Sequence, residues 1–456
     1  MLRITILADD LTGANAVAAL LKHEGFQATV HLGPHTYPQE GNRDRESPHL
    51  VQVWNVGTRN IPRESVSDRL VDFIHLLNIP VYTGEDLVGL RIDSTLRGSI
   101  AKTIDFLLQR RTDVFALVVP AFPASGRTTE NTIHFVDGVP VHETYVGHDP
   151  FSPVSSPDLR AVIGDPSGHT YDCLSIRDIR GGVAQVQDIL TSIHGEGVRM
   201  VLCDAVTDDD IDTLARAATR FAAKHPAVSL CPVDPGPFTA ALAKQLVSRL
   251  QGERLTIPSI ISDANGAATS REGFVLPDSP VILGISASIM HNAKKQMDFL
   301  ERDPYVHMYH YRGESADEVI RGLVQRCPKS KTTAETDWNR PFKSTIFLRT
   351  DTWQLPTEEA NTVVQHLPQV VSRILGEYPS ISGIYLSGGE AAASILTALG
   401  VTRLSLEEEL APLTTLSRPE NGFLMGRWVV TKGGSIGDEV AVSRMAAKMM
   451  STILRH

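Results

Sequence analysis

Two adjacent aspartates, Asp9 and Asp10, follow the apolar run 2–7 after a single alanine. The run has the β-branched content of a buried parallel strand, and the apolar residues within 17–21 recur at helical spacing. In open α/β sheets such a strand-to-helix turn is where ligands bind, and the helix start offers N–H groups to an anion. Paired carboxylates there can hold hydroxyls, a metal ion or a proton. One of the aspartates or Thr12 could instead cap the helix. We interpret the pair as a site, and Thr12 as the helix cap.

A second turn of this kind contains Asp93, Ser94 and Arg97, in the run Asp-Ser-Thr-Leu-Arg-Gly. Apolar spacing predicts a helix from about Ser99, followed by a strand at 114–119. Hydroxyls and an arginine at a helix N-terminus suit a small polyhydroxy anion, with the guanidinium for charge and the aspartate for hydroxyl protons. A capped helix with a buried Asp–Arg pair would use the same residues. Recurrence of the same kind of turn favours a site.

Two further arginines follow strands. Arg59 lies just beyond a strand predicted at 50–55, level with Asp10 in such a sheet, where it could clamp a carboxylate. Taken alone, it fits a surface arginine equally well. Arg127 lies in the run 120–129, whose prolines and glycine predict a rigid loop. It would add positive charge to the site or be a simple loop residue.

Glycine turns mark the second half of the chain. Two Gly-Gly pairs follow predicted strands and precede helices, so the backbone there can approach a phosphate closely. No Gly-x-x-x-x-Gly-Lys-Ser/Thr run exists, which excludes a P-loop enzyme. Serines after the strand predicted at 280–285 could contact phosphate or ribose, or cap a helix. The candidate nucleotide-binding residues are Ser286, Ser288, Gly388, Gly389, Glu390, Lys432, Gly433 and Gly434.

The order of elements predicts an α/β protein with two α/β domains whose largely parallel sheets are flanked by helices. We expect the domains at 1–262 and 275–456, joined by a linker around 263–271. A net charge of −10 argues against a nucleic-acid or acidic-membrane partner. The absence of a long apolar run or a signal peptide predicts a cytoplasmic protein. Four scattered cysteines argue against zinc and disulfides.

The turns at 7–15, 93–98, 120–129, 387–390 and 432–437 resemble those of the four-carbon acid sugar kinases, which phosphorylate tetronates with ATP. The resemblance spans nearly the whole chain. It implies an N-terminal acid-sugar domain, a C-terminal ATP domain and an active site in the cleft between them. It places the acid sugar at Asp10, Arg59, Asp93, Ser94 and Arg97, and ATP at Gly388, Gly389, Glu390, Gly433 and Gly434.

The chain departs from the family pattern at two positions. Ile285 stands where a serine is expected, which puts the roles of Ser286 and Ser288 in question. Ala391 follows Glu390 where a threonine is usual, so one hydroxyl contact is expected to be absent.

A phosphoryl-transfer mechanism follows as a hypothesis. Arg59 or Arg97 would bind the substrate carboxylate, and Asp10 or Asp93 would accept the hydroxyl proton, with Asp438 in reserve. Mg²⁺ would bridge the phosphates of ATP, and the glycine turns, with Lys432, would stabilise the transferring group. The expected partners are a sugar acid and ATP. A homodimer is among the assemblies that the sequence allows.

Three other classes of protein share parts of this pattern. The run Gly-Gly-Ser-Ile-Gly at 433–437 fits a hydrolase nucleophile elbow, but only the terminal His456 follows it, so the order of the triad fails. A phosphatase with an aspartate nucleophile needs a second aspartate two positions on, where this chain has Leu11 or Thr12. A sugar-acid sensor without ATP turnover is the binding-module alternative, and no recognisable DNA-binding segment supports it.

Overall fold

The computed structural model divides the chain into two compact units, Met1–Ala267 and Ala268–His456. The structure describes residues 2–34, 49–77, 86–149, 151–163, 170–254, 280–288, 291–303, 306–326, 345–351, 357–434 and 436–455. The linker predicted at 263–271 lies outside these residues. Within the described ranges, no helix is both long enough and apolar enough to cross a membrane.

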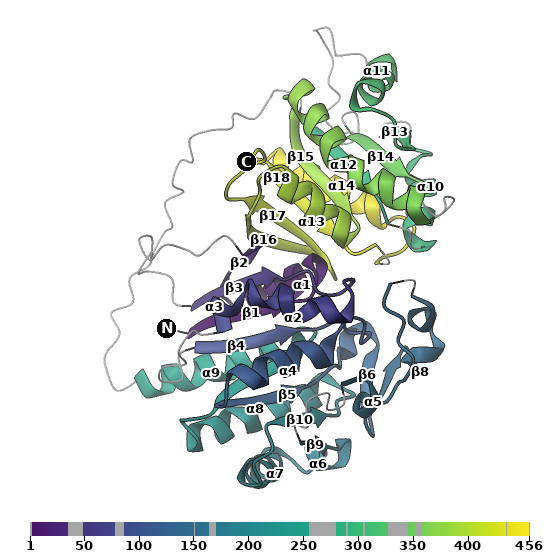
Figure 1. Cartoon of the computed structure of the whole chain (residues 1–456). Helices are drawn as coiled ribbons and strands as arrows, with labels where there is room; N and C mark the ends of the chain where they lie inside the picture. Colours follow the sequence, from purple (N-terminus) through teal and green to yellow (C-terminus); the bar gives the residue numbers. More distant parts are fainter. Residues whose placement is uncertain are drawn as a thin grey trace. The chain divides into compact units, whose positions relative to one another are not determined.

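The first unit is built on a parallel sheet with the strand order β2-β3-β1-β4-β11-β5-β10-β9 (Figure 1). Buried apolar side chains run nearly without interruption along its central strands, as expected for strands covered on both faces. The strands are β1 (Leu2–Ala8), β2 (Gln27–His31), β3 (His49–Asn55), β4 (Asp86–Arg91), β5 (Val114–Val118), β9 (Tyr171–Leu174), β10 (Met200–Cys203) and β11 (Ser229–Asp234).

Helices pack in two groups around this sheet. In one group α1 contacts α9, α9 contacts α8 and α8 contacts α7, while in the other α2 contacts α4 and α4 contacts α5. Buried side chains of the second group form a continuous core with the sheet. The helices are α1 (Leu11–His23), α2 (Val66–Val71), α3 (Ile74–Leu77), α4 (Ile100–Arg110), α5 (Leu159–Ile163), α6 (Ile176–Arg180), α7 (Val183–Gly195), α8 (Asp208–Lys224) and α9 (Pro237–Arg254).

A small antiparallel sheet follows β5, where the sequence predicted only a rigid loop. The chain makes a short 3₁₀ turn (Pro123–Ser125) and then the strands β6 (Arg127–Glu130), β7 (Ile133–Val136) and β8 (Val139–Pro140). The turns between these strands contain consecutive residues with positive φ, 131–132 and 137–138, as tight hairpins require. The prolines and the glycine of 120–126 thus precede β6, and the hairpin turns follow further along the chain.

The second unit has the strand order β13-β14-β12-β15-β18-β17-β16. The pairs from β13 to β18 are parallel, whereas β17 pairs antiparallel with both neighbours. The strands are β12 (Val281–Ser286), β13 (Val306–Tyr311), β14 (Thr345–Thr350), β15 (Ile381–Ser387), β16 (Arg403–Ala411), β17 (Thr414–Pro419) and β18 (Trp428–Lys432), and the helices are α10 (His291–Leu300), α11 (Ala316–Arg326), α12 (Thr357–Glu377), α13 (Gly389–Ala398) and α14 (Ala441–Ile453).

The core of this unit joins α14 and α10 to one face of the sheet, through methionines of the helices and aromatic residues of the strands. On the other side, α12 packs on α13 and α11 on α12. The predicted fold class, α/β with largely parallel sheets flanked by helices, is confirmed. The antiparallel β16–β17 hairpin was not foreseen.

Candidate functional site

Three neighbouring strands of the first unit bring the predicted turns together. Ala8, the last residue of β1, lies level with Asn55 of β3 and with Arg91 of β4. The backbone continues this alignment beyond the strands, because the amide of Asp9 donates to the carbonyl of Arg91 (3.2 Å) and the amide of Arg59 to the carbonyl of Asp9 (3.2 Å). Side chains from positions distant in the sequence therefore meet at one edge of the sheet.

Arg59 joins the aspartates of both turns. Its Nε and Nη2 donate to the two carboxylate oxygens of Asp9 (2.8 and 2.9 Å), and its Nη1 donates to Oδ2 of Asp10 (2.7 Å). Nη2 also lies 3.6 Å from Oδ1 of Asp93. Burial opposes the charge, yet Asp10 and Asp9 outweigh it and raise the pKa of Arg59 well above its usual value. The guanidinium therefore stays charged among three carboxylates.

Arg91 is a second buried cation of this site, which the sequence did not single out. Its Nη1 lies 3.0 Å from Oδ1 of Asp9 and 3.2 Å from Oδ1 of Asp10, and only 4% of its side chain is exposed. Read in sequence, it is merely the last residue of an apolar strand. The register of β4 against β1 is what turns it toward the aspartates.

The turn at 93–98 closes on itself through Asp93. Oδ2 of Asp93 accepts from the Thr95 hydroxyl (2.5 Å) and from Nε of Arg97 (2.7 Å). Burial opposes ionisation, but Arg97 and Arg59 outweigh it and hold the pKa of Asp93 well below its usual range. The buried Asp–Arg pair of the alternative interpretation is therefore present, and it lies within the cluster. The role of the turn as a binding site stays a prediction.

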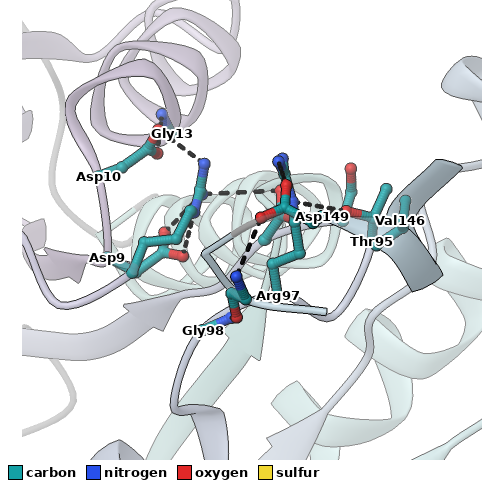
Figure 2. Close-up of polar contacts among 12 residues, drawn as sticks. Asp9, Asp10, Gly13, Thr95, Arg97, Gly98, Val146 and Asp149 are labelled. Atoms are coloured by element: carbon teal, nitrogen blue, oxygen red, sulfur yellow. Dashed lines mark hydrogen bonds and ion pairs between the residues drawn. The ribbon is translucent and has the colours of Figure 1, made fainter. Parts of the chain in front are cut away.

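A further acidic residue, Asp149, completes the cluster and was not predicted. Its Oδ2 lies 3.0 Å from Nη1 of Arg97, and the amide of Gly98 donates to the hydroxyl of Ser152 (2.7 Å). Figure 2 shows the aspartates of the first turn linked to Arg97 and Asp149 by a run of hydrogen bonds and ion pairs. Asp149 is 52 positions away from Arg97 in the chain. The spacing of residues along the sequence therefore does not predict their contact.

Asp10 also caps helix α1. Its Oδ1 accepts from the amide of Gly13 (2.7 Å), so the cap is Asp10 and the assignment to Thr12 is wrong. An extended backbone at Asp10 aims its side chain back over the first turn of the helix. The same carboxylate thus uses one oxygen for the helix and the other for Arg59.

The cluster carries four carboxylates (Asp9, Asp10, Asp93 and Asp149) and three guanidiniums (Arg59, Arg91 and Arg97), which leaves one formal negative charge. Burial raises the pKa of Asp9 despite the arginines beside it. Of the three guanidiniums, that of Arg97 is the most exposed, at 22%, against 11% for Arg59 and 4% for Arg91. An anion arriving from solvent therefore meets Arg97 first.

Arg127 takes part in none of the ion pairs of this cluster among the described residues. Its Nη1 donates instead to the carbonyl of Ser125, two residues before it.

In the second unit, the candidate nucleotide residues lie at the carboxyl ends of three adjacent parallel strands. Ser286 lies level with Ser387, and Ser387 lies level with Lys432. The amide of Ala287 donates to the carbonyl of Ser387 (3.2 Å), and a Cβ on Gly388 would lie 3.5 Å from the amide nitrogen of Ser288. These segments are thus in direct contact.

The glycine turns use part of their own hydrogen-bonding capacity. The amide of Gly388 donates to the carbonyl of Lys432 (3.0 Å), and the amide of Gly433 donates to that of Leu413 (3.1 Å). The first turn of α13 begins at Gly389, and its backbone amides have no acceptor within the helix, so they are the candidate donors to an anion. Gly388 has a φ of 108°, which a residue with a side chain rarely adopts.

Lys432 is a buried cation at the end of β18. It is 2% exposed, and its Nζ donates to the carbonyl of Gly433 (2.9 Å). Burial lowers its pKa to about 7. The hydroxyl of Ser387, in register beside it, is buried without a hydrogen-bond partner in the described part of the chain. A buried ammonium group beside a buried hydroxyl that lacks a hydrogen-bond partner fits an anionic ligand, such as the phosphates of a nucleotide.

Asp438, the reserve candidate for a base, is an exposed residue whose Oδ2 pairs with Nη2 of Arg444 at 2.9 Å. Ser435, the hydrolase candidate, lies outside the described residues. Among the residues that the structure describes, no three His, Cys, Asp or Glu side chains gather as a metal site. Mg²⁺ in kinases is held by one or two carboxylates together with the phosphates, so the fit of this ion depends on the nucleotide.

Two protein-family models match the chain. The sugar-binding N-terminal domain matches residues 4–242, more than half of the chain, and the nucleotide-binding C-terminal domain matches residues 283–442. The chain therefore belongs to the four-carbon acid sugar kinase family, and the resemblance predicted from its turns is confirmed.

Curated relatives match over nearly the full length. The chain is 27% identical to a D-erythronate kinase of Heliobacterium modesticaldum, over 99% of this chain and 98% of the relative. It is 23% identical to a D-threonate kinase of Salmonella typhimurium, over 96% of each. It is 22% identical to a 3-oxo-tetronate kinase of Haemophilus influenzae, over 89% of this chain and 91% of the relative.

Two solved structures share the fold. One is a Salmonella typhimurium protein provisionally described as a tRNA synthase, with a TM-score of 0.73 and 19% identity over 98% of this chain and 99% of that one. The other is a Haemophilus influenzae protein of the DUF1537 family, with a TM-score of 0.66 and 17% identity over the same shares. At these identities the likeness concerns the fold alone.

Proposed function

We propose that this protein is an ATP-dependent kinase that phosphorylates a hydroxyl of a four-carbon acid sugar. The observation that carries the proposal is the buried cluster in which Arg59 joins Asp9, Asp10 and Asp93. It combines guanidiniums, which pair with a carboxylate, with carboxylates, which accept hydroxyl protons. D-Threonate, D-erythronate and 3-oxotetronate each have a carboxylate and hydroxyl groups. The names of the relatives point to these acids.

Arg97 is the guanidinium that we assign to the substrate carboxylate, because it is the most exposed of the three. Its Nε stays with Asp93, and Nη1 would exchange Asp149 for the incoming carboxylate. Such an exchange replaces one carboxylate by another on the same cation, so the charge balance at Arg97 is kept. Ser94 and Asp93 would then receive the hydroxyls of the acid.

Asp10 is the base that we favour over Asp93. A general base works best when its pKa lies near the working pH, and the pKa of Asp93 is held well below its usual range by its arginine neighbours. Arg59 would orient Asp10 and stabilise the charge that develops near the transferring group.

The nucleotide would bind at the second unit, with its phosphates at the first turn of α13 and beside Lys432. Gly388 and Gly389 allow the close approach, and Lys432 would take up a proton and pair with a phosphate oxygen. The remaining candidates for contact with the nucleotide lie in the segments beside these: Ser286, Ser288, Glu390, Gly433 and Gly434. Mg²⁺ bound to the phosphates would supply charge neutralisation to the reaction. The chain itself orients the acid, removes its proton and holds the phosphate oxygens.

A panel assay tests the proposal. ADP formation is followed with ATP, Mg²⁺ and D-threonate, D-erythronate, L-threonate, 3-oxotetronates or D-glycerate in turn. We expect turnover with one of the four-carbon acids and little with D-glycerate, because the shorter acid leaves part of the cluster unpaired. Absence of turnover with every four-carbon acid, while ATP still stabilises the protein against heat, would contradict the substrate assignment. Absence of ATP binding as well would favour a sugar-acid sensor.

A further inference from the structure

The small antiparallel sheet reaches the site turn through one histidine. His134 of β7 is fully buried, with Nε2 2.9 Å from the carbonyl oxygen of Ser94 and Nδ1 3.0 Å from the hydroxyl of Thr129. A carbonyl can only accept, so Nε2 carries the proton. Nδ1 is then the acceptor, and the hydroxyl of Thr129 donates to it. Burial lowers the pKa of His134 to about 4, so the ring stays neutral near pH 7.

The hairpin that carries His134 is held independently of the site. The carboxylate of Asp204 accepts from the amides of Asn131 (2.7 Å) and Thr132 (2.9 Å), at the tight turn between β6 and β7. The backbones of Thr129 and Ala205 exchange two hydrogen bonds, of 2.8 and 3.0 Å. Thr129 and His134 are therefore fixed in place by β10 and the residues after it, whatever the site turn does.

The site turn needs such external support. Leu96 has a φ of 63°, which is unfavourable for a residue with a branched side chain, and Gly98 has a φ of 91°. The bonds that Asp93 makes to Thr95 and Arg97, and from its carbonyl to the amide of Leu96 (3.0 Å), all lie within the turn. They close the turn on itself. Its orientation on the rest of the unit depends on contacts to other segments: Arg97 pairs with Asp149 and the amide of Gly98 donates to Ser152, while the carbonyl of Ser94 is held by His134.

We propose that His134 is a positioning residue for the acid-sugar site, which holds the carbonyl of Ser94 and thereby sets the orientation of Asp93 and Arg97. The inference rests on the proposed function, because the turn at 93–98 is the part that would bind the acid. His134 itself touches no substrate in this account. Its contribution is to keep the turn in the one arrangement that presents both side chains to the ligand.

Paired variants of His134 test this role. His134→Gln keeps an N–H donor near the position of Nε2, whereas His134→Leu removes it. The matched control is His194→Leu, which removes an imidazole that packs edge-on against Phe115 and Phe221. We expect His134→Leu to raise KM for the acid by about tenfold, the scale of one lost hydrogen bond, and to leave KM for ATP within about twofold. His134→Gln should recover most of the affinity for the acid.

Two kinetic results would overturn the inference. One is a His134→Leu enzyme with the acid KM and kcat of the unaltered protein. The other is an equal rise of both KM values, which would indicate general damage to the fold. If His134→Leu does not fold, Thr129→Val takes its place, because it removes the donor to Nδ1 with little change of volume. It should weaken acid binding in the same direction by a smaller factor, and an unchanged KM would overturn the proposal.

Amide hydrogen exchange separates this inference from the proposed function. In His134→Leu the amides of 94–98 should exchange faster than in the unaltered protein, with recovery in His134→Gln and no change in His194→Leu. This readout needs no substrate. Absence of turnover by the unaltered protein in the panel assay would contradict the proposed function but not the role of His134 in holding the turn. Unchanged exchange at 94–98 in His134→Leu would contradict the role of His134 even in an active kinase.

Discussion

Gly13 and Arg91 are packed so closely that a side chain on the glycine would overlap the guanidinium. A Cβ built on Gly13 would lie 1.7 Å from Nη1 and 2.1 Å from Cζ of Arg91. The first turn of α1 therefore lies directly on the buried cation that pairs with Asp9 and Asp10. A glycine at position 13 is what lets one helix start supply a cap for itself and a carboxylate pair for the site.

Gly13→Ala should displace Arg91 from the aspartates. The guanidinium is buried and has little room to move, so we expect at least a tenfold loss of kcat/KM for the acid, on the order of one lost ion-pair contact. Gly195→Ala is the matched control, because a Cβ there would meet nothing within 4 Å. Steady-state kinetics of the two variants checks this. Equal activity of Gly13→Ala and Gly195→Ala would contradict a role for Arg91.

Arg59→Met should destabilise the first unit, because it leaves Asp9, Asp10 and Asp93 buried together with less compensating charge. Removing one partner of a buried ion pair typically costs about 3 kcal/mol or more. We expect a loss of that size in the free energy of unfolding, measured with urea at pH 7. Arg63→Met is the control, since Arg63 is exposed. A loss in Arg59→Met no larger than in this control would show that the carboxylates do not depend on Arg59.

Most of the first unit's fold could be predicted from the sequence, because buried parallel strands read as apolar runs and their helices as a 3.6-residue period. The hairpins were missed for a physical reason. At 120–129 the prolines and glycine indicate a loop. The pairing of β6 with β7 depends on the turn at 131–132, and that of β7 with β8 on the turn at 137–138. The dipeptide Asp137-Gly138 is a hairpin signal that could have revealed the second of these turns.

The residues of the site could be predicted only in part from the sequence. Asp10, Asp93 and Arg97 stand out because they lie in turns between an apolar strand and a helix. Arg91 and Asp149 do not, because their roles depend on strand register and on a contact between distant parts of the chain. Spacing along the chain carries no information of that kind. The glycine turns of the second unit were visible, but which of their amides remain available was not.

Lys432 should make ATP binding depend on pH. Its pKa of about 7 means that the ammonium form prevails below pH 7 and the neutral amine above it. Phosphates attract the charged form, so we expect the affinity for ATP to fall as the pH rises from 6 to 8. Calorimetric titrations of Lys432→Met should give weaker binding without this part of the pH dependence. A pH dependence shared by both proteins would belong to ATP itself and would contradict the assignment.

Lys432 should also lower the free energy of unfolding of the protein without nucleotide. Its pKa is 10.5 when unfolded and about 7 when folded, so between these values the unfolded state binds more protons and stability rises with pH. At pH 7 the difference corresponds to about 4 kcal/mol. Lys432→Met should therefore raise the free energy of unfolding in the absence of nucleotide, whereas Lys295→Met, at an exposed position, should not. Destabilisation of Lys432→Met would contradict the burial penalty.

The central claim is that a hydroxyl of a four-carbon acid receives the γ-phosphate of ATP with Asp10 as the base. Transfer from γ-labelled ATP, with the acid selected in the panel, tests it most directly in the unaltered protein, Asp10→Asn and Asp93→Asn. We predict label in a phosphorylated acid, a loss of about 10²-fold or more in kcat for Asp10→Asn, and a rise in KM for Asp93→Asn. Label that appears only in inorganic phosphate, or an Asp10→Asn enzyme with unaltered kcat, would contradict the account.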